Sequence, residues 1–401
     1  MVDNTRRIWI TASHPSVSLN DTIGDMVRIR ALARAIEQQG WHCDIITTDT
    51  LNGRYGLSPG VREAPVDRQR KNRLKTWLPV GAWNAGKDIA YLLHNRRFLR
   101  YLHDLTLPRP DLIIDYNFYC NNAALRFARH HRLPLISNIE GLMTDTMEGV
   151  ARSWLQPLGN RLEIAKYRSA DMLWAVSEPL AARLQQCLGN RQPPLTVVPN
   201  AVTTGNTSNP QPIRQRLGLT GQPIIGFVGG LSNWYALDRL IEICHRLRRT
   251  YPGLQLLIVG DGPERGQLTD LIERLQAGDW CLMTGLVPHR NVADYIGCFD
   301  IGVITRHQWW TCPLKLIEYG AQGIAVVAPD LPSITAIAPP DEIGLFKAGD
   351  YDSFTAALTE LIEKSDRRRT MADRFEQRIQ QHYSLDAMQR RIAASVDRLL
   401  S

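Results

Sequence analysis

Short apolar runs alternate with longer amphipathic stretches along most of the chain, and this alternation restricts the possible folds more than any other feature. The run 7–13 is typical of a buried strand, and 24–39 carries apolar residues at helical spacing. Gly40 suits the end of that helix, and 41–49 has the character of a second strand. A strand, a helix and a second strand form the βαβ unit of a parallel sheet. The chain is therefore predicted to have an α/β fold.

The same pattern continues and then starts again. Further strands are predicted at 111–117, 134–140, 171–177 and 196–200, with helices near 121–130 and 160–169. In the second half, strands are expected at 223–230, 254–263, 280–287, 300–306 and 324–330, and helices at 236–250, 264–276, 290–297 and 313–322. The last 40 residues are expected to be helical.

A break separates the two series. The stretch 201–212 is rich in Gly, Asn, Thr and Pro and lacks an apolar period, as linkers do. A chain of 401 residues is long for one core and suits two domains. We predict two doubly wound parallel-sheet (Rossmann-like) domains, 1–200 and 213–380, facing a cleft where ligands bind. Residues 381–401 are predicted to form a C-terminal helix.

Composition excludes several classes of protein. No run of 18 apolar residues and no signal peptide is present, and the seven cysteines form no CxxC pair, which favours a cytoplasmic protein with reduced thiols. No HExxH motif and no Cys/His cluster stands out, so neither a metal nor a cofactor is expected. Lys and Arg outnumber Asp and Glu by 47 to 40, which suggests anionic partners without choosing among phosphates, nucleic acid and lipid.

Five segments in the second half resemble the retaining glycosyltransferases of family 4 (glycosyl transferases group 1), which have the GT-B architecture. They are VVPNAV at 197–202, FVGGLSNWYALDRLIE at 227–242, LLIVGDGPE at 256–264, MTGLVPHRNVADYIGCFDIGVI at 283–304 and PLKLIEYGAQGIAVVAP at 313–329. SADMLWAVSE at 169–178 adds a weaker likeness in the first half. The resemblance implies transfer of a sugar, with retention and without a metal, from a nucleoside-diphosphate sugar held by the C-terminal domain. The acceptor is then a sugar, a lipid-linked sugar or a small molecule held by the N-terminal domain. The resemblance also implies that the C-terminal helix, 381–401, crosses back to the N-terminal domain.

The resemblance places Glu318 on the ribose hydroxyls of the donor, as the second acid of an E-x7-E pair. The flanking Pro313, Leu314 and Lys315 fit the same motif. The first acid of the pair is replaced by Trp310, within the loop that runs from Arg306 to Cys312. In this loop Trp309 and Trp310 either stack on a sugar face, beside polar donors such as His307, or one of them closes the domain edge.

The phosphate-binding cations of the family are missing from their usual places. Gly230 stands where the family has an Arg, and a residue near Tyr235 or Ala236 where it has a Lys. Lys315, at the start of a predicted helix, and Arg306 are the candidate substitutes, and each could instead be a surface cation. Gly229 and Gly230 would let phosphate approach the backbone. The remaining predicted donor-site residues, assigned to the nucleobase region by resemblance, are Gly260, Gly262, His289 and Arg290.

No side chain is expected to act as a nucleophile, because family members are thought to transfer the sugar on one face with help from the leaving phosphate. The first domain often adds a histidine after a late strand, and here Asn138 and Glu140 occupy that neighbourhood. Glu140 could orient a hydroxyl or accept a proton, or cap a loop. His14, after the first strand, is a second catalytic candidate, and it could equally be structural.

The segment 67–102 is strongly basic, with Trp77 and Trp83 beside its arginines and lysines. It fits either an interfacial segment on anionic lipid, at the inner face of the plasma membrane, or a solvated basic face. No recognised module supports nucleic-acid binding. Two other functions stay open: a non-catalytic scaffold with a GT-B fold, and a sugar-nucleotide epimerase. Polysaccharide or other glycoconjugate biosynthesis is the expected role.

Overall fold

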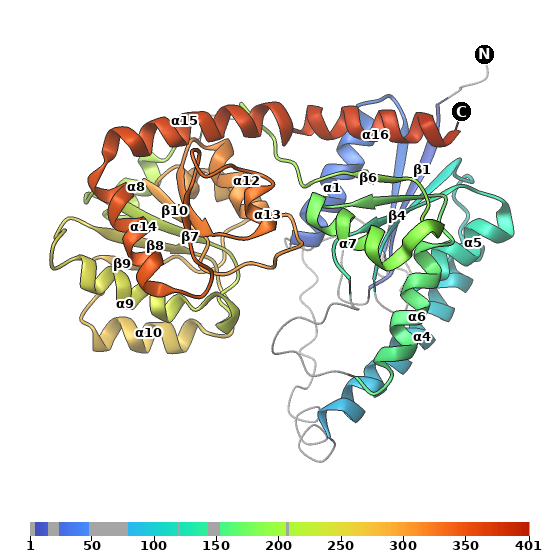
Figure 1. The fold of residues 1–401 in the computed structure, drawn as a ribbon, viewed down its shortest axis with the longest axis horizontal. Helices are drawn as coiled ribbons and strands as arrows, with labels where there is room; N and C mark the ends of the chain where they lie inside the picture. The colour runs from blue at the N-terminus through green and yellow to red at the C-terminus, as the bar shows by residue number, and fades with distance from the viewer. Residues whose placement is uncertain are drawn as a thin grey trace. The chain divides into compact units, whose positions relative to one another are not determined.

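The computed structural model describes residues 5–14, 24–47, 79–118, 121–142, 153–205 and 208–400. The chain divides into two units (Figure 1). The N-terminal unit consists of Met1–Val176, Leu180–Val198 and Gln389–Ser401, and the C-terminal unit of Ser177–Pro179 and Pro199–Met388. Trp77 and most of the basic segment 67–78 fall outside the described residues.

The N-terminal unit is built on a six-stranded parallel sheet of order β2-β1-β3-β4-β5-β6. Its four inner strands are almost wholly buried, as expected for a sheet covered on both faces, whereas its two edge strands are partly exposed. The strands are β1 (Arg7–Ala12), β2 (His42–Thr47), β3 (Leu112–Tyr116), β4 (Leu135–Ile139), β5 (Met172–Ala175) and β6 (Leu195–Val197). The helices between them are α1 (Gly24–Glu37), α4 (Val80–Asp104), α5 (Ala123–His131), α6 (Gln156–Tyr167) and α7 (Glu178–Leu188), followed by a short turn η1 (Gly189–Arg191).

The C-terminal unit repeats the architecture with a parallel sheet of order β12-β11-β10-β7-β8-β9. The strands are β7 (Ile224–Val228), β8 (Gln255–Val259), β9 (Cys281–Met283), β10 (Ile301–Val303), β11 (Ala325–Pro329) and β12 (Gly344–Phe346). The helices are α8 (Gln211–Leu217), α9 (Leu237–Leu247), α10 (Arg265–Arg274), α11 (Val292–Ile296), α12 (Leu314–Ala321), α13 (Pro332–Thr335), α14 (Tyr351–Glu363) and α15 (Ser365–His382), with turns η2 (Asn233–Tyr235) and η3 (His289–Asn291). Both sheets confirm the predicted α/β fold with two doubly wound parallel sheets.

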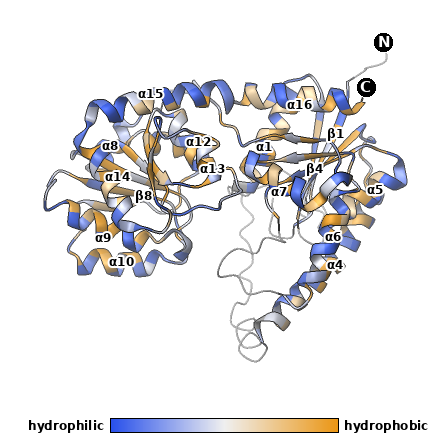
Figure 2. Cartoon of the chain, in the orientation of Figure 1, coloured by the Kyte–Doolittle hydropathy of each residue, from blue (hydrophilic) through white to orange (hydrophobic). Residues whose placement is uncertain are grey.

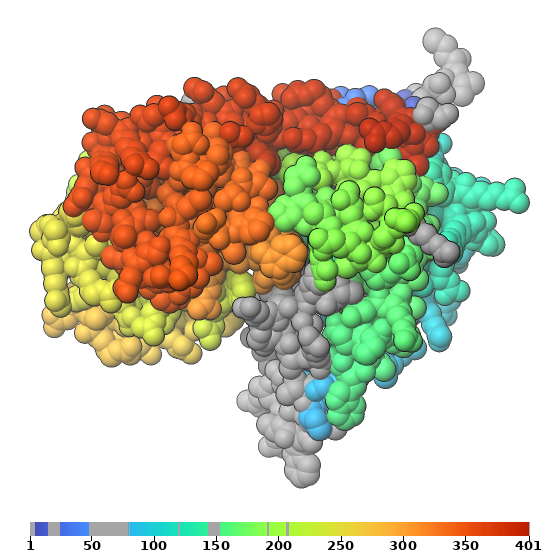
Figure 3. Space-filling model, in the orientation of Figure 1, coloured from blue at the N-terminus to red at the C-terminus, as the bar shows by residue number. Residues whose placement is uncertain are grey.

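Helix α15 is polar over most of its surface but contributes one apolar stripe to the core of this unit. Its buried side chains are Met371, Ala372, Phe375 and Ile379, which form one stripe at helical spacing. The rest of the helix is hydrophilic in Figure 2, whereas strands such as β8 are coloured as hydrophobic. Helices α14 and α15 therefore lie at the surface, where Figure 3 shows them in red.

The last helix, α16 (Leu385–Leu400), begins in the C-terminal unit, and its residues from Gln389 onward belong to the N-terminal unit. Gln39 donates to the backbone oxygen of Gln389 at 3.2 Å, and Arg6 pairs with Asp397 at 2.6 Å. Ile392 and Val396 are fully buried. The C-terminal residues are thus part of the N-terminal unit's packing.

Several elements differ from the sequence expectation. The basic region yields a 25-residue helix, α4, whose buried residues include Phe98 and Leu102. Helix α7 and strand β12 were not predicted, and α8 begins at Gln211, inside the expected linker. In the part of the chain that the structure describes, no helix is long and apolar enough to cross a membrane.

Candidate active site

The candidate site of the C-terminal unit is built where β7 and β8 end side by side. Gly229 follows β7 and Gly260 follows β8, and both have a positive φ, of 146° and 141°. A Cβ atom at Gly260 would overlap the carbonyl oxygen of Gly229, so the two loops pack as closely as glycine allows. The predicted Gly262 lies in the same turn, where a side chain would collide with the backbone of Leu231.

Lys315, in the first turn of α12, points its ammonium group at these loops. Its Nζ lies 3.8 Å from the ring centroid of Tyr235 and 4.4 Å from that of Phe227. A Cβ atom at Gly229 would stand 3.1 Å from this nitrogen. The Nζ atom is buried and has no hydrogen-bond partner among the residues that the structure describes. Burial lowers the pKa of Lys315 to about 7, against the opposing charge of Glu318.

Glu318 lies one helical turn after Lys315, with a side chain that is 16% exposed. Its Oε1 is 3.2 Å from Nε2 of His289 in turn η3. Helix α12 is held against the end of β7 because the backbone N–H of Val228 donates to the hydroxyl of Tyr319 at 3.0 Å. The structure therefore brings Gly229, Lys315, Glu318 and His289 together, as the predicted donor site requires.

The loop before α12 is fixed by several hydrogen bonds. His307 and Thr311 share one at 2.7 Å, and Ser333 donates to the backbone oxygen of Gln308 at 2.7 Å. Asn200 donates to the backbone oxygen of Cys312 at 2.6 Å. Burial, together with the charge of Lys315, lowers the pKa of His307 to about 3, so its ring is neutral.

Trp309 and Trp310 meet edge to face, with ring centroids 5.3 Å apart. Trp310 is buried, at 8% exposure, and Trp309 is half-buried. Trp310, which stands where the family has its first glutamate, is thus placed as a packing residue, while Trp309 keeps part of its surface free.

The other predicted donor residues lie around this centre. Pro313 and Leu314 open helix α12, and Gly230 has open space where a side chain would be. Arg290, in turn η3, is exposed. Arg306 is also exposed, and its Nη2 lies 3.3 Å from the hydroxyl of Tyr351, at the start of α14. Of the two substitute cations, Lys315 is the one aimed at the glycine loops.

A second polar cluster lies in the N-terminal unit, at the carboxyl ends of its central strands. Arg28 of α1 is 3% exposed, and its Nη2 donates to Oδ1 of Asn138 at 2.9 Å and to the backbone oxygen of Val198 at 2.7 Å. Its Nε pairs with Oε1 of Glu140, which also accepts from Asn138 at 2.9 Å. Asn138 is fully buried, whereas the side chain of Glu140 is 27% exposed.

His14 packs nearby, against the rings of Tyr91 and Phe118 at 5.4 and 4.8 Å. Burial lowers the pKa of His14 and raises that of Asp25, which accepts a hydrogen bond from Tyr116 at 3.2 Å. Burial also raises the pKa of Glu140, although Arg28 opposes the shift. Sequence reasoning missed Arg28 and Asp25, and the available signal was a cation on the apolar face of the first helix.

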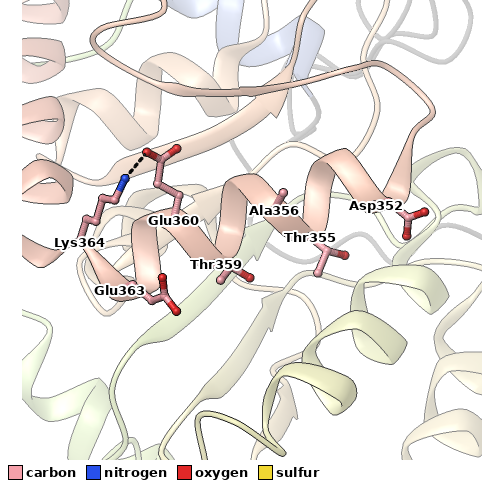
Figure 4. A pocket seen from close by; sticks show the side chains of 7 residues that line it. All are labelled: Asp352, Thr355, Ala356, Thr359, Glu360, Glu363 and Lys364. Carbon is pink, nitrogen blue, oxygen red and sulfur yellow. Dashed lines mark hydrogen bonds and ion pairs between the residues drawn. The ribbon is translucent and has the colours of Figure 1, made fainter.

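An open hollow also runs along α14 (Figure 4). All of its lining side chains come from that helix and the residue after it, and they include the Lys364–Glu360 ion pair at 3.0 Å. None of the predicted site residues lines this hollow.

Comparison with protein families gives matches in both halves. Residues 210–378 match the family Glycosyl transferases group 1, and residues 26–201 match the Glycosyl transferase 4-like domain. Residues 210–378 are thus a group 1 glycosyltransferase domain, and residues 26–201 are a glycosyltransferase 4-like domain.

The curated relatives of this chain are distant. An exopolysaccharide phosphotransferase of Streptomyces coelicolor is 28% identical over 48% of this chain and 20% of its own length. A glycogen synthase of Mycobacterium tuberculosis is 22% identical over 56% of this chain and 53% of its own. A GDP-mannose-dependent α-mannosyltransferase of Mycolicibacterium smegmatis is 30% identical over 36% of this chain and 35% of its own. The matched part thus spans about a fifth to a half of these relatives.

Solved structures establish the fold. Sucrose-phosphate synthase from Thermosynechococcus elongatus superposes with a TM-score of 0.74 at 17% identity, over 98% of this chain and 99% of that one. Anabaena HepE in complex with UDP-glucose superposes with a TM-score of 0.70 at 15% identity, over 98% of this chain and 99% of that one. These likenesses confirm that the chain has a GT-B fold.

Proposed function

We propose that this chain transfers a sugar from a nucleoside-diphosphate sugar to an acceptor hydroxyl, with retention of configuration and without a metal or cofactor. The observation that carries the proposal is the ammonium of Lys315, which is buried beside Gly229, one turn before Glu318, and has no hydrogen-bond partner among the described residues. An ammonium group with three unused donors is costly to bury, so its site suits an anion that brings acceptors of its own.

The donor diphosphate would lie between the glycine loops and α12. Lys315 and the N-terminal end of α12 would then face its oxygens, where negative charge grows as the bond to the sugar breaks. The family's lysine position falls near Tyr235 or Ala236, and the ammonium of Lys315 lies over the ring of Tyr235. We infer that Lys315 replaces the missing cation from the opposite side of the site.

Glu318 would accept hydrogen bonds from the two ribose hydroxyls, a charge-assisted contact that orients the nucleoside. Since His289 lies 3.2 Å from Glu318, it would either move aside or contact the same ribose. The name of one relative specifies GDP-mannose, and the solved HepE structure contains UDP-glucose. The base and the sugar of this donor are therefore left for experiment.

Reaction on one face of the sugar needs no protein nucleophile. The bond from the anomeric carbon to the diphosphate oxygen breaks, the acceptor oxygen bonds to that carbon on the same side, and the acceptor proton passes to a diphosphate oxygen. Glu140 keeps part of its carboxylate exposed and could orient the acceptor or the sugar, while Asn138 and Arg28 hold it in place. Asn138 is thus a positioning residue in this proposal, and His14 is a second group for acceptor contact.

The setting of this reaction in the cell is proposed from exposed side chains of the N-terminal unit. Ile89 and Leu93 on α4 are 51% and 52% exposed, and Trp154 and Leu158 near α6 are 67% and 47% exposed. Arg96, Arg97 and Arg100 follow on α4. Apolar side chains beside arginines suit peripheral contact with anionic lipid, as for an enzyme of polysaccharide or glycolipid synthesis on the cytoplasmic side.

A thermal-shift panel with UDP, GDP, ADP and TDP, each with and without magnesium, tests the donor site. One diphosphate should raise the melting temperature without metal, because a ligand that binds only the folded state stabilises it. Glu318→Gln should reduce that shift, whereas Glu273→Gln, on the exposed side of α10, should leave it unchanged. No response to any diphosphate would favour a non-catalytic scaffold, a reading that the replacement of the first motif glutamate by Trp310 supports.

A further inference from the structure

Three histidines meet where helices α4 and α5 end, on elements that supply none of the donor-site residues. His103 lies in the last turn of α4, and His130 and His131 are the last two residues of α5. Each offers one ring nitrogen, and these nitrogens all lie within 4.8 Å of one another. Among the residues that the structure describes, they form the one group of three or more His, Cys, Asp or Glu side chains arranged in this way.

Two of these nitrogens already have the spacing of metal ligands. Nε2 of His131 is 3.3 Å from Nδ1 of His103. Two imidazole nitrogens, each about 2.0–2.1 Å from a tetrahedral zinc ion, stand about 3.3–3.4 Å apart. His130 is exposed, so a rotation of its side chain can bring the third nitrogen to the same distance.

The surroundings of the three rings favour a cation in two ways. Both helices end here, and the carbonyl groups at a helix C-terminus carry partial negative charge. Phe127 packs against the rings of His103 and His131, with centroids 5.0 and 4.4 Å away, and this contact restricts their orientation.

One neighbour opposes metal binding. Nη2 of Arg109 lies against Nδ1 of His131, and its positive charge would repel an ion at the cluster. Arg109 is exposed, so its side chain can turn into solvent when an ion binds. Arg109 therefore lowers the affinity of the three histidines for a metal ion but does not prevent its binding.

We propose that His103, His130 and His131 bind one Zn²⁺ ion or a similar borderline transition-metal dication, which joins the end of α4 to the end of α5. Neutral imidazole nitrogens suit zinc, nickel and copper, whereas Mg²⁺ and Ca²⁺ require oxygen ligands. Three protein ligands leave the fourth position of a tetrahedral ion to water. This site is independent of sugar transfer, for which no metal is proposed.

The test uses the full chain without a histidine tag, stripped of metal by a chelator. Titration with Zn²⁺ by calorimetry should give one equivalent bound and a higher melting temperature. Co²⁺ should give visible absorption without a thiolate charge-transfer band, which separates the histidines from the free cysteines. His103→Gln and His131→Gln should each weaken Zn²⁺ binding at least tenfold, while His382→Gln, an exposed histidine on α15, should not change it.

Arg109→Gln gives a second, opposite expectation, because removal of the repelling charge should tighten Zn²⁺ binding. The metal-free variants should keep the melting temperature of the metal-free parent, which shows that they fold. Zn²⁺ binding unchanged in the triple variant of His103, His130 and His131 would overturn the proposal, and so would stoichiometric binding that disappears once the cysteines are alkylated. The diphosphate thermal shift of the chelator-treated protein reports separately on the donor site.

Discussion

At the scale of single residues, Lys315 connects the motif in the sequence to the chemistry of the site. The motif predicted a helix starting near Lys315 and made this lysine one of two candidate phosphate ligands. The structure adds that its ammonium lies over Tyr235 and Phe227 without a hydrogen-bond partner among the described residues. Those contacts join positions about 80 residues apart, so no local pattern could have revealed them.

Replacing Lys315 by Met keeps a chain of similar length against the two rings and removes the charge. We expect nucleoside-diphosphate affinity to fall about 10- to 150-fold, because hydrogen bonds to charged groups contribute about 1.5–3 kcal/mol. Calorimetric titration measures the change, with Arg306→Met as the matched control. An unchanged affinity in Lys315→Met, or a larger loss in Arg306→Met, would assign the phosphate contact elsewhere.

The pKa of Lys315 also predicts a pH dependence. Burial lowers it from 10.5 to about 7 in the ligand-free protein, so between these values the unfolded chain binds more protons, and this group makes stability rise with pH. A bound diphosphate favours the charged amine, so affinity should fall as pH rises above 7, by up to about tenfold per pH unit.

The neighbouring groups do not obscure this titration. Burial lowers the pKa of His307 to about 3 and raises the pKa values of Tyr235 and Tyr319, so these three groups stay neutral between pH 7 and 9. Glu318 only opposes the shift of Lys315. Dissociation constants at pH 6.5, 7.5 and 8.5 check the slope, and Lys315→Met should show little of it. Equal slopes in both proteins would exclude Lys315 as the titrating group.

At the scale of elements, α1 is joined to the ends of β4 and β6 through Arg28. This one side chain bonds Asn138, Glu140 and the backbone of Val198. Arg28→Met leaves the Glu140 carboxylate without its cation and removes the donor to Asn138 and Val198, and removal of one partner of a buried ion pair costs about 3–5 kcal/mol. We expect a clear fall in the melting temperature, measured by calorimetry.

Arg28→Lys separates charge from geometry, since lysine restores the charge without the planar fork. If Glu140 acts in transfer, this variant should recover most of the stability and less of the turnover rate. Arg34→Met, exposed on the same helix, serves as the control and should be nearly neutral. A stable Arg28→Met protein would show that the network adds little to the fold.

The predictability of the elements follows their local signals. Strands such as β7 and β8 are continuous apolar runs before glycine turns, so the sequence predicted them to within a few residues. Helix α4 has no acidic residue in its first turn and no side-chain cap, so the usual signals of a helix start are missing. Its many charged residues also made its apolar face hard to recognise in the sequence, and the helix was not predicted. The histidine cluster was also missed, because His103 meets His130 and His131 only through the packing of α4 on α5.

At the scale of the whole molecule, two similar units were predictable from the restart of the strand–helix series. The return of the last helix to the first unit was expected from the family resemblance and not from the local pattern, and the place of Ser177–Pro179 in the second unit was not expected. Ile392 is fully buried, and Ile392→Ala should destabilise the N-terminal unit by about 2–5 kcal/mol. Hydrogen exchange would locate the loss in β1 to β6, with the exposed Arg390→Ala as a neutral control. Protection lost only in β7 to β12 would contradict the assignment of this segment.

The place of α16 also has a consequence during synthesis. A ribosome makes the strands of the N-terminal unit first, yet Ile392 and Val396, which are buried in that unit, emerge almost 200 residues after β6. The sheet of β1 to β6 therefore keeps an apolar surface exposed until nearly the whole C-terminal unit has been translated. Nascent-chain folding of the first unit is thus timed by the arrival of residues 389–400, and a slow or interrupted translation would prolong its need for a chaperone.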